Sequence, residues 1–159
     1  MGSGKTSVGR KLSALLSYEF IDLDDYIVGA EGRSIPEIFE SEGEEGFRRI
    51  EKECLQRVLD EYESSGKNLV LSLGGGAVTT PECLEAVHDR TVCFYLKGSP
   101  AELRSHLGGD QSGRPMLQTG RLEEILSRRE PLYSAAAHHT ILIDGRSVRV
   151  LASRIASSL

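Results

Sequence analysis

Apolar residues recur along the chain in two alternating patterns. Short, nearly continuous apolar runs predict β-strands that are covered on both faces of a sheet. They lie at residues 19–23, 69–73, 91–96 and 140–144. Between these runs, apolar residues at three- and four-residue spacing predict amphipathic helices, for example over 4–17 and 47–62. Strands that alternate with helices indicate an α/β fold built on a parallel β-sheet.

Capping residues locate the starts of further helices. Ser34 and Glu37 have the S-x-x-E spacing of a capping box and predict a short helix to about Ser41. Pro81 fits the first turn of another helix. Ser147 is a suitable N-cap for the last helix of the chain.

The length of 159 residues fits a single domain, and we expect residues 1–159 to form it. Hydrophobic residues make up 39% and charged residues 27% of the chain, which excludes a disordered protein and a coiled coil. No apolar run reaches the roughly 18 residues of a membrane span, and no signal peptide begins the sequence. We therefore expect a soluble cytoplasmic protein with no membrane partner.

The net charge of −5 argues against general affinity for nucleic acids. Six arginines nevertheless lie within residues 90–129, which allows an anion-binding site in this half of the chain. The three cysteines, Cys54, Cys83 and Cys93, form no CxxC pattern and stand among apolar residues. This placement predicts buried, reduced thiols.

The most informative motif lies at the start of the chain. Gly-Lys-Thr at residues 4–6 is the second half of the Walker A pattern G-x-x-x-x-G-K-[ST], and an amphipathic helix follows at once. In such a loop, backbone N–H groups bind phosphate, the lysine bridges the β- and γ-phosphates, and the threonine hydroxyl binds Mg²⁺. The predicted nucleotide-binding residues are Gly2, Ser3, Gly4, Lys5, Thr6 and Ser7. The alternative interpretation is a flexible chain start.

Part of the Walker A context is missing from the sequence. The first glycine of the pattern would precede Met1, and the helix over residues 4–17 has no strand before it. Four strands are readable in total. If the chain begins at Met1, we expect a weakened fold and poor ATP binding.

Two acids, Asp22 and Asp24, flank Leu23 at the end of the apolar run 19–23. On an extended chain, residues two apart point to the same side, and ligands bind at the carboxyl ends of parallel strands. One acid would hold Mg²⁺, and the other would orient an attacking hydroxyl or accept its proton. The alternative is a solvated turn at a helix start, where acids are common.

Two pairs of arginines are candidates for binding an anionic ligand. Arg48 and Arg49 lie on the helix predicted at 47–62, and Arg128 and Arg129 lie near the end of a later helix. A guanidinium group binds a carboxylate through two parallel hydrogen bonds. The alternatives are pairing with neighbouring glutamates for the first pair and interaction with the helix C-terminus for the second.

Three consecutive glycines, Gly74, Gly75 and Gly76, directly follow the apolar run at 69–73. Residues without a Cβ atom let the backbone approach a ligand closely. A plain turn needs only one glycine. The triplet therefore favours a ligand-binding role over a simple turn.

A long polar segment at residues 108–120 contains four glycines and carries Arg114. It is either a surface loop or a lid whose arginine closes on bound phosphates. A phosphate loop, strand-end acids and additional arginines together predict a kinase that uses ATP or GTP with Mg²⁺. Its acceptor would be a small anionic alcohol.

The order and spacing of these motifs resemble those of shikimate kinases. The matching segments are GSGKTSVG at 2–9, FIDLDD at 20–25, GRSIPEIFESEGEEGFRRIE at 32–51, LSLGGGAVT at 71–79, GRPML at 113–117 and RREPLY at 128–133. The resemblance implies a P-loop kinase fold like that of nucleoside monophosphate kinases, with a five-stranded parallel sheet flanked by helices. It also implies an acceptor-binding segment at 24–52 and a lid at 108–118. We expect the protein to be a monomer. The implied reaction is the ATP-dependent phosphorylation of the 3-hydroxyl of shikimate, a step towards chorismate and the aromatic amino acids.

The resemblance further implies individual roles at the reacting end of the site. Asp24 matches the acid that contacts the acceptor hydroxyls and acts as the base. Asp22 matches the acid near Mg²⁺, with Thr6 as a metal ligand, and Lys5 matches the catalytic lysine of the phosphate loop. Arg114 matches the lid arginine that reaches the acceptor and the phosphates.

The remaining implied roles concern the residues that bind the acceptor carboxylate and those near the adenine. Arg48 and Arg129 match the pair that binds the acceptor carboxylate, beside the backbone of the glycine triplet. On the adenine side the sequence departs from the family pattern, and Arg104 and Arg146 are the candidate residues there. Two alternatives stay open, namely a kinase of another anionic polyol such as gluconate and a nucleotide-binding relative without catalytic activity.

Overall fold

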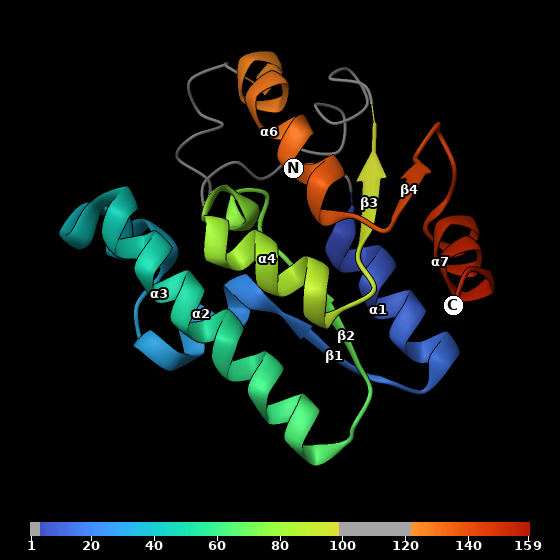
Figure 1. The fold of residues 1–159 in the computed structure, drawn as a ribbon, viewed down its shortest axis with the longest axis horizontal. Helices are drawn as coiled ribbons and strands as arrows, with labels where there is room; N and C mark the ends of the chain where they lie inside the picture. The colour runs from blue at the N-terminus through green and yellow to red at the C-terminus, as the bar shows by residue number, and fades with distance from the viewer. Residues whose placement is uncertain (1–3, 99–121) are drawn as a thin grey trace.

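A computed structural model describes residues 4–98 and 122–159 of the chain. Its helices and strands alternate along the sequence, as the apolar pattern predicts (Figure 1). They are α1 (Lys5–Leu16), β1 (Glu19–Asp22), α2 (Leu23–Glu31), α3 (Ile35–Ser65), β2 (Leu69–Ser72), the short 3₁₀ helix η1 (Ala77–Thr79), α4 (Pro81–Arg90), β3 (Phe94–Lys97), α6 (Leu122–Ala136), β4 (His139–Leu142) and α7 (Val148–Ser157).

The four strands form two parallel pairs. β1 pairs with β2, so that Asp22 lies opposite Ser72 at the carboxyl end of both strands. β3 pairs with β4, with Phe94 opposite His139. The predicted parallel α/β architecture is confirmed. Within the described residues, however, the four strands make two separate two-stranded sheets, because β2 and β3 do not pair with each other.

Helix α1 joins the two strand pairs through one apolar cluster. Val8 and Leu12 of α1 are buried in it with Leu96 of β3 and Leu151 of α7. Val70 of β2 packs against the same cluster. Figure 1 shows α1 next to α7 on the side where the two sheets approach each other. The apolar stripe predicted for residues 4–17 therefore holds both sheets to one helix.

A second apolar cluster lies under α2, α3, α4 and α6. Leu23, Ile27 and Ile38 are completely buried in it, and Leu55 of α3 and Val87 of α4 join them. This cluster fixes α2 and α3 against the carboxyl end of β2. The acceptor-binding segment predicted at residues 24–52 falls on these two helices.

The structure corrects the prediction that Asp22 and Asp24 share one extended strand. β1 ends at Asp22, and α2 begins at the next residue. The Asp22 carboxylate caps this helix by accepting a hydrogen bond of 3.2 Å from the Asp25 N–H. Asp24 therefore lies in the first turn of α2. Both acids stand at a helix start, but both are only partly exposed and so do not form a solvated turn.

The prediction of a short helix to about Ser41 and a separate one from 47 is confirmed, since the non-helical Gly43 divides the element α3 into two helical stretches. Ser34 and Glu37 form the expected capping box. The two stretches meet at a kink at Gly43, where φ is 71° and ψ is −176°. Only glycine adopts this backbone conformation readily, so Gly43 accounts for the kink.

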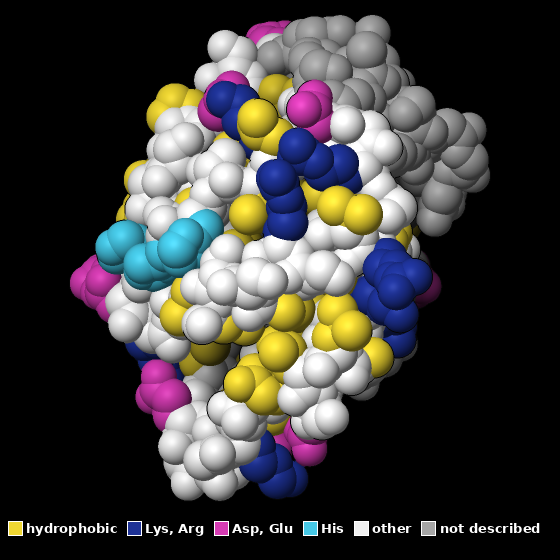
Figure 2. All heavy atoms as spheres, turned by 90° about the vertical axis from the view of Figure 1, so that its right-hand side faces the viewer, with side chains coloured by type: hydrophobic (Ala, Val, Ile, Leu, Met, Phe, Trp, Pro, Cys, Tyr) yellow, Lys and Arg dark blue, Asp and Glu magenta, His cyan; other side chains and the backbone are white. Residues whose placement is uncertain are grey.

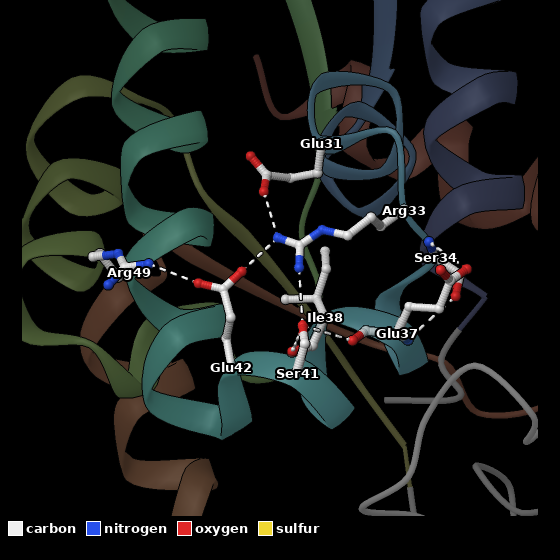
Figure 3. Close-up of polar contacts among 8 residues, drawn as sticks. All are labelled: Glu31, Arg33, Ser34, Glu37, Ile38, Ser41, Glu42 and Arg49. Atoms are coloured by element: carbon white, nitrogen blue, oxygen red, sulfur yellow. Dashed lines mark hydrogen bonds and ion pairs between the residues drawn. The ribbon is translucent and has the colours of Figure 1, made fainter.

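A cluster of charged side chains braces the first part of α3 (Figure 3). The Arg33 guanidinium donates hydrogen bonds to Glu31 at the end of α2 and to Ser41 and Glu42 on α3. Glu42 also accepts a hydrogen bond of 2.9 Å from Arg49, which lies beyond the kink. These contacts connect α2 with both sides of the Gly43 kink.

The prediction of buried, free thiols is confirmed for Cys54 and Cys83, whereas Cys93 is free but only half-buried. Hydrophobic side chains gather on the face formed by α7 and β4 (Figure 2). It exposes Leu142 and Val150, with arginine side chains close by.

Among the described helices, none has the length and apolar composition that a membrane crossing requires.

Candidate active site

The phosphate-binding end of the site is built where α1 begins and β1 ends. Gly4 has a φ of 79°, a left-handed conformation that favours glycine, and it serves as the N-cap of α1. Lys5, Thr6 and Ser7 follow in the first turn, where backbone N–H groups have no partner within the helix. Such a helix terminus binds anions. Gly2 and Ser3, which the sequence places in the same loop, lie outside the described residues.

The structure brings together the two residues predicted to hold Mg²⁺. The Thr6 hydroxyl donates a hydrogen bond of 2.7 Å to Oδ2 of Asp22. A hydroxyl and a carboxylate are hard oxygen ligands, and Mg²⁺ is commonly bound by one or two such groups together with phosphate and water oxygens. In the described residues no cluster of three or more metal-ligating side chains occurs. The pair therefore fits a metal ion that arrives with a nucleotide.

The acceptor end of the site begins with Asp24 and the glycine triplet. Asp24 stands in the first turn of α2, and Gly74 follows β2. A Cβ atom on Gly74 would lie 3.0 Å from Oδ1 of Asp24. Glycine at this position lets the backbone after β2 pass directly beside the carboxylate.

Gly76 has an equally specific neighbour. A Cβ atom built on it would overlap with the guanidinium of Arg48 and would lie 2.7 Å from its Cζ atom. Arg48 comes from α3, so this contact connects α3 with the loop after β2. The structure shows close approach of the triplet backbone to two protein side chains, Asp24 and Arg48, and its approach to a ligand stays a prediction.

Each arginine pair contains one largely buried and one exposed member. The side chain of Arg48 is 15% exposed, whereas that of Arg49 is 60% exposed and pairs with Glu42. In the second pair, Arg129 is 7% exposed, whereas Arg128 is 73% exposed and pairs with Glu124 on its own helix. The two largely buried members, Arg48 and Arg129, are the ones assigned by the resemblance to carboxylate binding.

Glu51 is a site residue that the sequence analysis missed. It is 1% exposed and accepts a hydrogen bond of 2.8 Å from Arg48. Burial raises the pKa of its carboxyl group, and the Asp24 charge adds to this effect, while Arg48 and Arg129 lower the pKa. The sequence analysis considered glutamates near Arg48 and Arg49 only as alternative surface partners of these arginines. The spacing of Glu51 held the contrary signal, since it lies four residues after Phe47 on the buried face of α3.

Arg129 and Tyr133 complete the acceptor end from α6. They are four residues apart and therefore on the same face of the helix. The Tyr133 hydroxyl donates a hydrogen bond of 2.6 Å to the carbonyl of Gly75. The pKa of Tyr133 is raised by burial and lowered by the charge and hydrogen bond of Arg129. Helix α6 thus contacts the glycine triplet as well as supplying an arginine.

Several predicted residues do not belong to this described cluster. Arg104, Arg114 and the predicted lid at 108–118 lie outside the described residues. Arg146 stands in the loop between β4 and α7, and its guanidinium donates a hydrogen bond of 3.0 Å to the Leu142 carbonyl. Its suggested role near adenine stays a prediction.

The assembled site has two chemically different ends. One end offers a helix N-terminus, a lysine and a hydroxyl–carboxylate pair, as a magnesium nucleotide requires. The other offers the Asp24 carboxylate beside two largely buried arginines, as an acceptor with both a hydroxyl and an anionic group requires. The fold and the site together define a P-loop kinase for a small anionic alcohol.

Comparison with known proteins gives the family. The shikimate kinase family matches residues 1–159, and the chain belongs to this family. The shikimate kinase of Dechloromonas aromatica is 44% identical over 149 residues, which cover 91% of this chain and 77% of the relative. That of Acinetobacter baylyi is 43% identical over 159 residues, covering 98% and 85% of the two chains.

Solved structures agree with this assignment. Shikimate kinase from Acinetobacter baumannii in complex with shikimate superposes with a TM-score of 0.91 at 38% identity, covering 99% of this chain and 87% of the other. Shikimate kinase from Bacteroides thetaiotaomicron superposes with a TM-score of 0.87 at 28% identity, covering 99% and 93%. The predicted family and the P-loop kinase fold are therefore confirmed.

Proposed function

We propose that this chain transfers the γ-phosphoryl group of ATP to the 3-hydroxyl of shikimate, forming shikimate 3-phosphate and ADP in the route to chorismate and the aromatic amino acids. One observation carries the proposal. The glycine triplet after β2 packs against both Asp24 and Arg48, which places a proton acceptor and a carboxylate-binding group around the same backbone. Shikimate carries the matching groups, several hydroxyls and one carboxylate.

At the nucleotide end, the backbone of residues 2–7 and the Lys5 ammonium bind the phosphates. Thr6 and Asp22 would hold Mg²⁺, which would supply neutralisation of phosphate charge when bound with ATP. Their mutual hydrogen bond of 2.7 Å keeps both oxygen atoms at one point of the site. Lys5 adds positive charge where the transferring group gains negative charge.

At the acceptor end, Asp24 orients the 3-hydroxyl and accepts its proton as the oxygen attacks phosphorus and the bond to ADP breaks. Arg48 and Arg129 bind the shikimate carboxylate through charge-assisted hydrogen bonds. Glu51 fixes Arg48 in position through their hydrogen bond of 2.8 Å. The backbone of the glycine triplet forms the wall of the pocket between Asp24 and Arg48.

The remaining assignments rest on the resemblance. Residues 24–52 form the acceptor-binding segment, and residues 108–118 form a lid from which Arg114 reaches the phosphates. Arg104 and Arg146 contact the nucleotide on the adenine side. The protein acts as a cytoplasmic monomer without nucleic-acid or membrane partners. Its mass in solution, measured by light scattering, is expected to equal the chain mass of 17.4 kDa.

A coupled assay for ADP formation tests the activity. We expect ATP consumption that depends on both shikimate and Mg²⁺. Turnover of gluconate without turnover of shikimate would assign the chain to a different anionic polyol. A thermal-shift titration separates the second alternative, because stabilisation by ADP and shikimate without turnover would indicate a binding protein that does not catalyse.

The variant Asp24→Asn tests the base. It keeps the size of the side chain but removes its ability to accept a proton, so kcat should fall by at least about 100-fold, the lower end of the usual contribution of acid–base catalysis. The thermal shift with ADP should stay at the parental value. An unchanged kcat would refute the proposed role of Asp24.

A further inference from the structure

Tyr133 occupies a position between two parts of the acceptor site. Its hydroxyl donates a hydrogen bond of 2.6 Å to the Gly75 carbonyl, and the Arg129 side chain also hydrogen-bonds to this tyrosine. A phenol has one proton to donate and can accept at the same oxygen. Because the proton goes to Gly75, the hydrogen bond with Arg129 is one that the tyrosine oxygen accepts. The hydroxyl therefore connects an arginine of α6 to the loop after β2.

The loop itself shows why this connection matters. The Gly74 carbonyl accepts a hydrogen bond of 3.2 Å from the Ala77 N–H, and the Gly76 carbonyl accepts bonds from both the N–H and the hydroxyl of Thr79. These contacts are local. The Gly75 carbonyl is bound instead by a side chain 58 positions further along the sequence. Three glycines in a row carry no side chains that would hold the loop, so this long-range bond restricts their conformational freedom.

We propose that Tyr133 is a positioning residue, whose hydroxyl holds the Arg129 guanidinium and the glycine loop in the arrangement that receives the acceptor carboxylate. This inference rests on the proposed function, since it names the residue that organises the same site. Tyr133 need not touch the acceptor. It reduces the number of arrangements that Arg129 and the loop adopt before the acceptor binds, and preorganisation of this kind improves affinity.

The matched pair of variants is Tyr133→Phe and Tyr95→Phe. The two rings pack against each other with centroids 5.1 Å apart, so both substitutions remove one hydroxyl and keep the packing of the ring. For Tyr95 the structure gives no hydrogen bond to the described residues. A role of Tyr133 in packing alone would make the two variants behave alike.

Steady-state kinetics and calorimetric titration of shikimate test the proposal. For Tyr133→Phe we expect the KM and the Kd for shikimate to rise about tenfold, as the loss of a hydrogen bond to a charged group implies. The KM for ATP and the melting temperature should stay close to those of Tyr95→Phe. Equal shikimate affinity in the two variants would overturn the proposal.

A double-mutant cycle with Arg129→Lys tests whether Tyr133 acts through Arg129. If it does, Tyr133→Phe should change shikimate affinity by less than twofold in the Arg129→Lys background. Additive effects of the two substitutions would contradict the positioning role.

Hydrogen exchange without any ligand gives a measurement that does not depend on the proposed function. Amide exchange at residues 74–79 should accelerate in Tyr133→Phe but not in Tyr95→Phe. Unchanged exchange would overturn the inference even in an active enzyme. If exchange is faster in Tyr133→Phe but the parent protein neither binds nor phosphorylates shikimate, the result would support the role of Tyr133 in restraining the glycine loop and would refute the proposed function.

Discussion

Single residues of the same type have opposite roles in this protein. Arg48 and Arg49 are neighbours, yet one is directed towards the glycine loop and the other is largely exposed. The same division separates Arg129 from Arg128. Consecutive helix positions differ by about 100° around the axis, so two neighbours at the edge of the buried face can have different surroundings. The function of each arginine therefore follows from the direction in which its helix packs.

Glu51 gives a pH-dependent prediction. Burial raises the pKa of its carboxyl group above the ordinary value of 4.5, so the folded protein binds this proton more tightly than the unfolded chain. The associated stability is fully present below pH 4.5 and is lost as the pH rises through the raised pKa. Relative to Glu51→Gln, the unfolding free energy of the parent protein should fall as the pH rises over this range.

Urea unfolding of both proteins across this pH range provides the measurement. The difference between parent and variant isolates Glu51 from the other carboxylates of the chain. Parallel stability profiles would contradict the raised pKa.

Gly76→Ala tests the close approach of Arg48 to the loop. The added Cβ would overlap with the guanidinium, so Arg48 must move and the KM for shikimate should rise at least about tenfold. Gly29→Ala on α2 is the control, because nothing lies within 4 Å of its Cβ position and its φ is not positive. The control should be as active as the parent. Equal KM values for shikimate in both variants would show that Arg48 is not constrained by Gly76.

At the scale of elements, the apolar pattern predicted the four strands and most helices. It missed α2, although the signal was present, since Leu23 and Ile27 are spaced by four and both are completely buried. The run at 19–23 was interpreted as continuous strand because a short apolar segment looks alike in both conformations. Asp22 decides the boundary by capping the helix, and this is a local interaction that apolar periodicity does not report.

Gly43→Ala addresses the kink of α3. An alanine with a φ of 71° and a ψ of −176° is strained, so the substitution should destabilise the protein by about 1–3 kcal/mol. Gly29→Ala, within a regular helix, should stabilise it by about 0.5–1 kcal/mol. Urea midpoints measure both effects. A Gly43→Ala variant as stable as the parent would show that the kink is not required.

At the scale of the whole molecule, the two ends of the site belong to different packing units. The phosphate-binding end starts on α1, whose apolar face lies in the cluster with α7 and β3. The acceptor end is carried by α2, α3 and α6, which share the second cluster. β1 and β2 run between them, and their carboxyl ends carry Asp22 and the glycine triplet.

Hydrogen exchange with separate ligands should reveal this division. Shikimate should slow exchange in α2, in the first half of α3 and in the glycine loop, whereas ADP with Mg²⁺ should slow it in the first turn of α1. Helix α7 serves as the internal control, because it contributes no residue to the acceptor end. Equal protection of all elements by shikimate would contradict separate binding regions.

The sequence by itself determined the class of this protein. Local signals were sufficient to identify the class, because each depends on neighbouring residues. They are the Gly-Lys-Thr motif before a helix, the alternating strands and helices, and the order of the acidic, glycine-rich and arginine-rich segments. Tertiary structure decided which members of those segments meet. The burial of Glu51 and the contact of Tyr133 with Gly75 depend on the packing of distant elements, which spacing along the sequence does not report.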